Sequence, residues 1–382
     1  LLRARAECEA DSGEIRAALV TLGSALKTAK EAGDPQLEGR VLGTLGLLQR
    51  NRGDISAARQ SYQQALACAR RCGDDPTRGA MLNNLAGLEH DQARFSEAET
   101  LFLEALELAL SRQQALGAAT AQLNLGTISA ERGDLRRAHH FYAQALSTFE
   151  EHGDRSYSST VIALIGMVEL DEGLADRAKK RFSEVLKHAV VSGDLVAQVM
   201  SECWHGVAHW LESEEEAAFL RFRAAAGLMS QLSSPKHLAF THAYYGAMLA
   251  QRGRIGEARE QFRLARYLMR ESGNRNHLDS LKVLVGIAAV SLAQAAYKAG
   301  DEQSFARHLS IAIARRNYAQ TPTPESEQFP EGLPSPIQRS CDARLCLKLL
   351  DRCLSKLPNI PDDLAQQLRP EEAPRDTLPP GL

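Results

Sequence analysis

The sequence predicts an all-α protein built as a solenoid of seven to eight helical hairpins. Turn glycines recur every 40 residues, in two sets that are displaced from each other by 20 residues. Between the turns, apolar residues recur at steps of three and four, and proline is almost absent, which is typical of amphipathic helices. Two turns per repeat make each repeat a helical hairpin, and hairpins that repeat in this way stack into a solenoid.

The two sets of turn residues mark the ends of the helices. The first set is Gly13, Gly53, Gly133, Gly173 and Gly253, with Ala93 and Ser213 in the gaps. The second set is Gly33, Gly73, Gly153, Gly193 and Gly273, with Gln113 and Ser233 as exceptions. At several turns Asp follows Gly, as in Gly53-Asp54. We expect Gly to adopt the left-handed conformation at the helix end and Asp to cap the next helix with its side-chain oxygen.

Small and large residues alternate at fixed repeat positions. One position is always alanine: Ala18, Ala58, Ala98, Ala138, Ala178, Ala218 and Ala258. Four residues later come Leu22, Tyr62, Phe102, Tyr142, Phe182, Phe222 and Phe262. Twelve residues before each alanine comes Ala6, Gly46, Ala86, Gly126, Gly166, Gly206 or Gly246. We expect the small residues of both helices to meet at the closest approach within a hairpin, and the large residues to fill the space between hairpins.

These positions resemble the tetratricopeptide repeat, whose pattern appears as Leu125-Gly126, Ala138-x-x-x-Tyr142 and Ala145. The resemblance covers residues 1 to about 300, in 40-residue units similar to those of kinesin light chain and of sensor halves of bacterial signalling ATPases and kinases. An eighth unit, at about 275 to 317, is displaced from the 40-residue spacing. The resemblance implies a right-handed superhelix in which the first helix of each hairpin lines a concave groove.

The groove positions that the resemblance assigns are polar in the second to fourth 40-residue repeats. They include Arg40, Thr44, Arg50, Asn83, Asn84, Asn124 and Thr127. Because an amide side chain has both donors and an acceptor, a row of asparagines suits the backbone of an extended peptide. The two arginines suit a carboxylate. The alternative is that all of these are ordinary solvated residues on a wide inner wall.

From the fifth 40-residue repeat onward the same positions are apolar, and they include Met167, Trp204, Trp210, Phe240 and Tyr244. A large apolar patch on a soluble protein normally marks an interaction site. The sequence leaves open three ways in which this patch could be buried. Tight superhelical curvature would bury these residues against adjoining helices, an amphipathic helix of the same chain would occupy this half of the groove, or an external hydrophobic partner would bind there.

The end of the chain differs from the solenoid, because eleven of the fourteen prolines follow Gln320. We predict the solenoid over residues 1–317, a Pro-rich linker over 318–340, an amphipathic helix over 341–357 and a disordered tail over 358–382. Leu345 and Leu349 lie on the apolar face of that helix. A basic ridge follows it at steps of four: Arg344, Lys348, Arg352 and Lys356.

The composition and motifs of the chain argue against nucleic-acid binding, membrane association and enzymatic activity. Lys plus Arg 45 against Asp plus Glu 48 gives a net charge of −3, which supplies no basic field for nucleic acid or an anionic membrane. The sequence contains no run of ~18 apolar residues, so it predicts no membrane span, and no signal peptide is visible at its start. Seven cysteines, an odd number, are typical of reduced thiols in the cytoplasm. The sequence also lacks phosphate-binding, dinucleotide-binding, G-x-S-x-G and C-x-x-C motifs, so we expect neither enzymatic activity nor a cofactor.

Two pairs of residues have a spacing that metal ligands use. His205 and His209 are four residues apart, as are Cys68 and Cys72, so each pair would share one helical face. Neither pair has an evident third ligand. We therefore expect no metal site, and we expect His205 to be a partly buried, hydrogen-bonded histidine.

The sequence thus predicts a scaffold that binds a protein or peptide in its groove. By resemblance it is the sensor or adaptor part of a larger bacterial signalling protein, such as a regulator or kinase. The alternative is a self-association scaffold whose groove is filled by its own C-terminal helix. Because residue 1 falls inside the first expected helix, we also expect further chain before it.

Overall fold

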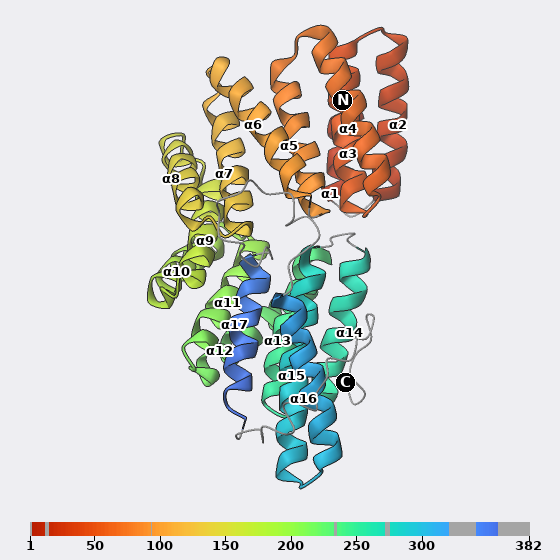
Figure 1. Ribbon diagram of the computed structural model, residues 1–382. Helices are drawn as coiled ribbons and strands as arrows, with labels where there is room; N and C mark the ends of the chain where they lie inside the picture. The colour runs from red at the N-terminus through yellow and green to blue at the C-terminus, as the bar shows by residue number, and fades with distance from the viewer. Residues whose placement is uncertain are drawn as a thin grey trace. The chain divides into compact units, whose positions relative to one another are not determined.

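The computed structural model describes residues 2–11, 15–92, 94–232, 235–271, 276–320 and 341–357 (Figure 1). Within these ranges the regular secondary structure is helical throughout. The helices are α1 (Leu2–Asp11), α2 (Ile15–Glu31), α3 (Pro35–Asn51), α4 (Ile55–Cys72), α5 (Asp75–Asp91), α6 (Phe95–Ser111), α7 (Ala115–Glu131), α8 (Leu135–Glu151), α9 (Arg155–Asp171), α10 (Ala175–Ser192), α11 (Leu195–Leu211), α12 (Glu215–Leu228), the short 3₁₀ helix η1 (Met229–Gln231), α13 (Pro235–Gln251), α14 (Ile255–Glu271), α15 (Asn276–Lys298), α16 (Glu302–Gln320) and α17 (Cys341–Leu354).

The helices belong to two compact units. Unit 1 contains α1 to α6, α8, most of α7 and the start of α9, over residues 1–129 and 136–161 with a short piece at 270–275. Unit 2 contains residues 130–135, 162–269 and 276 onward, and therefore α10 to α17 with the ends of α7 and α9.

The predicted fold class is confirmed, because α1 to α16 follow one another as eight helix pairs. Consecutive helices lie side by side in Figure 1 and pack against each other, as α3 does with α4 and α11 with α12. The first helix of one pair also contacts the first helix of the next, as α3 does with α5 and α11 with α13. These two sets of contacts are those of an α-solenoid.

The turns have the predicted conformation. The backbone φ angle is +77° at Gly53 and +73° at Gly193, in the left-handed region that favours glycine. Two of the four exceptions adopt it as well, with φ +54° at Gln113 and +66° at Ser213, whereas Ala93 and Ser233 lie outside the described residues. Asp54 caps α4, since its carboxylate accepts a hydrogen bond from the backbone N–H of Ala57 at 3.2 Å.

One packing prediction is wrong in its detail. In four hairpins, those with Gly46, Gly126, Gly166 and Gly206, the glycine of the first helix faces the aromatic ring of its own hairpin and not chiefly the alanine. A Cβ on Gly126 would lie 2.6 Å from ring atoms of Tyr142, and one on Gly166 would lie 2.8 Å from Phe182. These rings therefore fill the interior of their own hairpins, and at Gly126 and Gly166 a Cβ would lie too close to the ring for normal contact.

The segment boundaries near the C-terminus differ slightly from those predicted. Helix α16 continues to Gln320, three residues beyond the predicted end of the solenoid, and α17 ends at Leu354. The rest of the predicted linker and the whole predicted tail lie outside the described residues.

Helix α15 is a second departure from the sequence prediction. Its segment Ser280–Lys298 is long and apolar enough to span a membrane by length and composition alone. Most of that segment is buried inside unit 2. Because Val283, Ile287 and Val290 of this helix belong to the hydrophobic core, its apolar character is accounted for by packing.

Candidate functional site

One repeat position of the first helices carries both the polar and the aromatic candidates. Thr44, Asn84, Asn124, Trp204 and Tyr244 are separated by multiples of 40 residues. They lie on α3, α5, α7, α11 and α13, and equivalent positions of equivalent helices present the same face. We call this face of each first helix its groove face. The polar side chains of unit 1 are half-buried there, whereas the two aromatic side chains of unit 2 are buried.

The amide side chains of unit 1 form a short row across α5 and α7. Asn124 Nδ2 donates to Asn83 Oδ1 at 3.5 Å, and Asn83 Nδ2 donates to the carbonyl of Gly79 at 3.1 Å. Asn84 makes no hydrogen bond to another residue that the structure describes. The structure thus pairs Asn124 with Asn83 and leaves the amide group of Asn84 available, at a position that is still half-exposed.

Both predicted arginines contact carboxylates of this chain. Arg50 donates from Nε and Nη2 to Asp91 Oδ2, at 2.9 and 2.6 Å, and its guanidinium lies against Gly87 on α5. Arg40 lies 3.4 Å from Asp74 Oδ2. An acidic ligand would therefore compete with Asp91 and Asp74 for these guanidinium groups.

The two candidate threonines use their hydroxyl protons within their own helices. Thr44 Oγ1 donates to the carbonyl of Arg40, and Thr127 Oγ1 donates to the carbonyl of Leu123, each at 3.2 Å. Thr127 Oγ1 also accepts a hydrogen bond from Tyr142 at 3.3 Å. These hydroxyl groups are therefore engaged, and the amides are the stronger candidates for ligand contact.

The apolar candidates of unit 2 pack on one another as an aromatic cluster of Trp204, Phe240 and Tyr244. The ring centroids are 4.8 Å apart for Trp204 and Phe240 and 4.6 Å apart for Phe240 and Tyr244. The three residues are at most 4% exposed, and Met167 packs partly buried against the same core. Adjoining helices therefore supply part of the cover that the sequence analysis left open.

Trp210, the other predicted groove tryptophan, is also buried. Its side chain is 2% exposed, and its ring lies edge-on to Phe222 of α12, with centroids 6.0 Å apart. Trp210 therefore belongs to the interior of the hairpin formed by α11 and α12. Trp210 occupies the same repeat position as Arg50.

Helix α17 supplies the rest of the cover. Its residues Leu345, Cys346, Leu349 and Leu350 are fully buried and belong to the same hydrophobic core as the aromatic cluster. Cys346 Sγ lies 3.1 Å from the hydroxyl of Tyr244. Helix α17 packs against α11, α15 and α16, and it lies beside α11 and α15 in Figure 1.

The basic ridge of α17 follows the C-terminal ends of successive first helices. Arg344 Nη1 and Nη2 donate to the carbonyls of Glu131 and Ala130 at the end of α7, at 2.9 and 2.6 Å. Its Nε donates to Asp171 Oδ2 at the end of α9, at 2.8 Å. Lys348 Nζ lies 2.9 Å from the other carboxylate oxygen, Oδ1, of Asp171.

The second half of the ridge continues this pattern. Arg352 donates to the carbonyl of Leu211 at the end of α11 and to Ser213 Oγ in the following turn, at 2.9 Å from Nε. Lys356 Nζ lies 2.5 Å from Glu215 at the start of α12. The last carbonyls of a helix have no partner inside the helix and carry partial negative charge, so cations stabilise these ends.

A family match now identifies the repeats. Residues 77–151 match the tetratricopeptide repeat family. This match covers about a fifth of the chain. The match spans α6, α7, α8 and most of α5, and it therefore includes Asn83, Asn84 and Asn124. No curated protein matches the chain at a significant level.

Several solved structures share this fold at low identity. The Rap conjugation gene regulator of plasmid pLS20, solved in complex with the Phr* peptide, is 15% identical with a TM-score of 0.57, over 76% of each chain. Aspartyl phosphate phosphatase F from Bacillus subtilis is 16% identical with a TM-score of 0.57, over 71% of this chain and 70% of its own. A signal transduction ATPase with a tetratricopeptide repeat sensor, from Pyrococcus horikoshii, is 13% identical with a TM-score of 0.50, over 70% of this chain and 41% of its own.

The acceptors of the basic ridge were missed in the sequence of this repeat protein. Asp171 is the central one, and its side chain is only 7% exposed. It occupies the repeat position of Asp91, which binds Arg50 in unit 1. The four-residue spacing of the ridge is visible in the sequence. Because every residue has a main-chain carbonyl, the sequence does not show which carbonyls accept hydrogen bonds from the ridge, and only the folded structure does.

The paired histidines, His205 and His209, lie on α11. Their rings stack with centroids 4.9 Å apart, and within the described residues no group of three or more His, Cys, Asp or Glu side chains is arranged to hold a metal ion. His205 is buried as expected, but its Nδ1 has no hydrogen-bond partner among the described residues, contrary to the prediction. Burial, together with the positive charge of Arg221, lowers the pKa of His205 to about 4.

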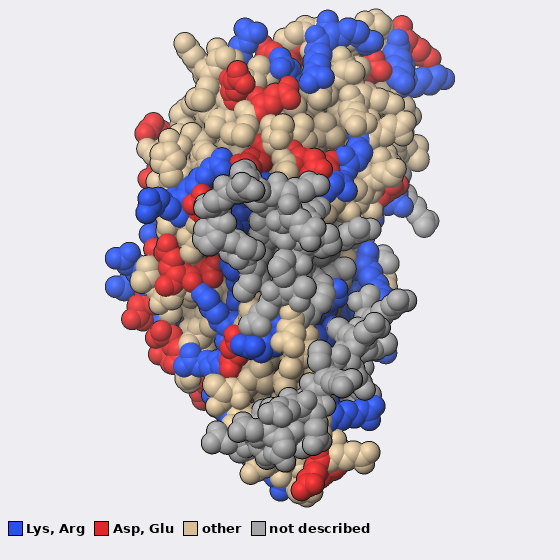
Figure 2. Space-filling model, in the orientation of Figure 1, with Lys and Arg blue, Asp and Glu red and all other residues tan. Residues whose placement is uncertain are grey.

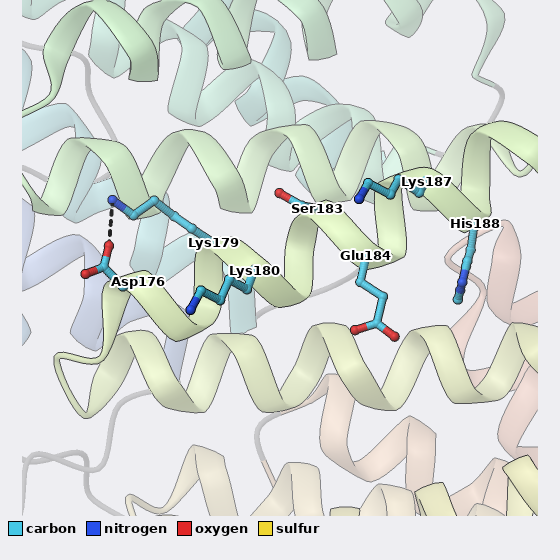
Figure 3. Close-up of a pocket in the computed structure, with 7 residues that line it drawn as sticks. All are labelled: Asp176, Lys179, Lys180, Ser183, Glu184, Lys187 and His188. Carbon is cyan, nitrogen blue, oxygen red and sulfur yellow. Dashed lines mark ion pairs between the residues drawn. The ribbon is translucent and has the colours of Figure 1, made fainter.

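The surface of the array also has a hollow of about 750 Å³ along α10. Figure 3 shows that all seven residues that line it project from this one helix, among them Lys179, Lys187 and His188. Lys179 forms an ion pair with Asp176 at 3.2 Å. Because a single helix supplies the whole lining, the hollow is an open surface and not an enclosed site.

Proposed function

We propose that this chain is a non-enzymatic scaffold that binds a protein or peptide on the groove face of unit 1. The observation that carries the proposal is the row of Asn83, Asn84 and Asn124, in which Asn84 keeps both its donors and its acceptor available. An extended peptide presents N–H and C=O groups that amides can satisfy together. The flanking pair of Arg50 and Asp91 is neutral, so recognition rests on the peptide backbone more than on net charge.

The similar solved structures support a regulatory role for such a scaffold. One is a gene regulator bound to a peptide, and another contains a tetratricopeptide repeat sensor. We propose that this chain is the sensor or adaptor part of a larger bacterial signalling protein, a regulator or kinase, in the cytoplasm. Lys and Arg alternate with Asp and Glu on the face drawn in Figure 2, which supports a protein ligand over nucleic acid or membrane.

We also propose that α17 is a built-in occupant of the groove face of unit 2. Its contact with Tyr244 supports this, because Tyr244 occupies the repeat position of Asn84 and Asn124. Helix α17 thus covers the counterpart of the surface that unit 1 offers to a ligand. The scaffold then has one open face and one filled face.

The open face can be tested with peptides selected from a random 12-residue display library on the wild-type protein. The variant Asn84→Ala/Asn124→Ala removes two amides, and at ~1 kcal/mol for each lost hydrogen bond we expect affinity to fall by about tenfold or more. The matched control is Gln63→Ala/Gln64→Ala, which removes two exposed amides from α4. Equal affinity of the selected peptides for all three proteins would contradict the proposed groove.

The second candidate function is self-association through α17. It is favoured by the apolar face of α17, which is buried in the core of unit 2 and would fit the same surface of a second copy. Light scattering on the full chain decides between the two. A dimer that dissociates in Arg344→Glu would support self-association, and a monomer supports docking within one chain.

A further inference from the structure

The surface beneath α17 contains a built site for one guanidinium group. Arg344 reaches a carboxylate oxygen of Asp171 and two main-chain carbonyls, those of Ala130 and Glu131, at 2.6 to 2.9 Å. The Arg344 side chain is 15% exposed and that of Asp171 is 7% exposed. Charge-assisted hydrogen bonds of this kind are roughly twice as strong as neutral ones, so this site is the anchor of the helix.

Further cation sites follow at the spacing of one helical turn. Lys348, Arg352 and Lys356 meet Asp171, the end of α11 and Glu215 in turn. Residues four apart share one helical face, so the surface selects a helix with cations at every fourth position. The other face of such a helix must be apolar, because the hydrophobic core buries the face of α17 that contains Leu345 and Leu349.

The occupant of this surface is an addition to the solenoid and not one of its stacked repeats. In a solenoid each repeat contacts its neighbours, as α11 does with α13 and α13 does with α15. Helix α17 packs on α15 and α16 and also reaches residues up to 214 positions away in the sequence. The contacts of α11 with α13 and of α13 with α15 are made without α17.

We propose that this surface binds a cationic amphipathic helix of another protein, which displaces α17. The partner helix carries Lys or Arg at four successive positions spaced by four residues, with Arg at the first, and an apolar opposite face. The inference rests on the proposed function of α17 as a built-in occupant. Charge complementarity carries it, since the negative ends of α7, α9 and α11 lie beneath one row of cations.

The test measures whether such a helix binds in trans to the full chain. The probe is a fluorescent peptide of residues 341–357, followed by anisotropy in reducing buffer. A tethered helix competes at a millimolar effective concentration, so a peptide of micromolar affinity should bind the wild type up to about a thousandfold more weakly than a chain with a weakened α17. The weakened chains are Arg344→Glu/Arg352→Glu and, independently, Lys348→Glu/Lys356→Glu, and circular dichroism checks that each is folded.

Two controls fix the chemistry. Arg136→Glu/Arg177→Glu makes the same charge change at exposed arginines on α8 and α10 and should leave the weak binding of the wild type unchanged. A peptide of identical composition with its four cations distributed around the helix should bind none of the proteins.

The outcomes separate the proposal from its alternatives. Binding that is at least tenfold tighter to both weakened chains, and that falls as salt rises, supports it. Equal affinity for wild type and weakened chains, or equal binding of the redistributed peptide, overturns it and makes α17 a permanent part of the fold. A dimer that dissociates on charge reversal also overturns it, in favour of a second copy. None of these results depends on Asn84 or Asn124, so the groove of unit 1 succeeds or fails separately.

Discussion

Replacement of Gly126 by alanine tests the packing principle of the whole array. Gly126 lies on α7 under the ring of Tyr142 on α8, and a Cβ at this position would approach two ring atoms to 2.6 Å. Tyr142 is 1% exposed, so its ring has no free space into which it could move. The added methyl group must therefore displace a packed aromatic side chain.

The magnitude follows from two opposing effects. Alanine is favoured over glycine inside a helix by about 0.8–1 kcal/mol. An extra methyl group in a well-packed core costs about 1–3 kcal/mol, and a contact well inside van der Waals distance with a rigid ring belongs in the upper half of that range. We expect Gly126→Ala to lower the free energy of unfolding of unit 1 by about 1–2 kcal/mol.

Urea unfolding followed by circular dichroism measures the effect, and Gly23→Ala is the matched control. Gly23 lies on α2 of the same unit, and nothing lies within 4 Å of the position that its Cβ would occupy. Only the helical preference acts there, so this control should be stabilised by up to about 1 kcal/mol. The two substitutions are chemically identical and should shift stability in opposite directions.

A double-mutant cycle isolates the ring as the cause. With Tyr142→Leu in the background, Gly126→Ala should lose most of its cost, with a coupling energy of about 0.5–3 kcal/mol. If Gly126→Ala stabilises the protein as much as Gly23→Ala does, or if its cost is unchanged without the ring, the reasoning from small residues beneath aromatic rings is refuted.

Three further outcomes follow from the charged and titratable groups. Asp171→Asn removes the carboxylate that holds two cations of α17, so hydrogen exchange of residues 343–354 should become faster; unchanged exchange would contradict the role of this carboxylate. Burial alone would raise the pKa of Glu89, but hydrogen bonds from Arg59 and Arg94 hold it below its usual range. Its stabilisation is complete above the unfolded pKa of ~4.3 and is lost as the pH falls through the folded value, and Glu89→Gln should flatten that loss in acid unfolding curves. His205, with its pKa near 4, stays neutral while the unfolded chain gains a proton below ~6.5, so stability should fall between these pH values; His205→Leu should remove this dependence, and an NMR titration of the imidazole near pH 6.5 would contradict it.

The sequence alone determined the fold class and the elements, because both depend on local periodicity. The turn spacing, the alanine row and the aromatic row predicted seven to eight helical hairpins, and the described residues form eight helix pairs. The turn predictions held even at Gln113 and Ser213, where the chain adopts the left-handed conformation without glycine. Repeat position also predicted which side chains share one face, as with Asn84 and Asn124.

Only the tertiary structure decided which of those side chains remain available. The sequence could not show that Trp204 packs on Phe240 of α13, whereas Trp210 packs on Phe222 of α12. Nor could it pair Arg344 with Asp171 and the carbonyls of α7, because that contact joins residues far apart in the chain and two of its acceptors are main-chain atoms. Local pattern fixes where a helix begins and which face is apolar, whereas the choice of partner depends on which helix ends and apolar surfaces the folded chain brings together.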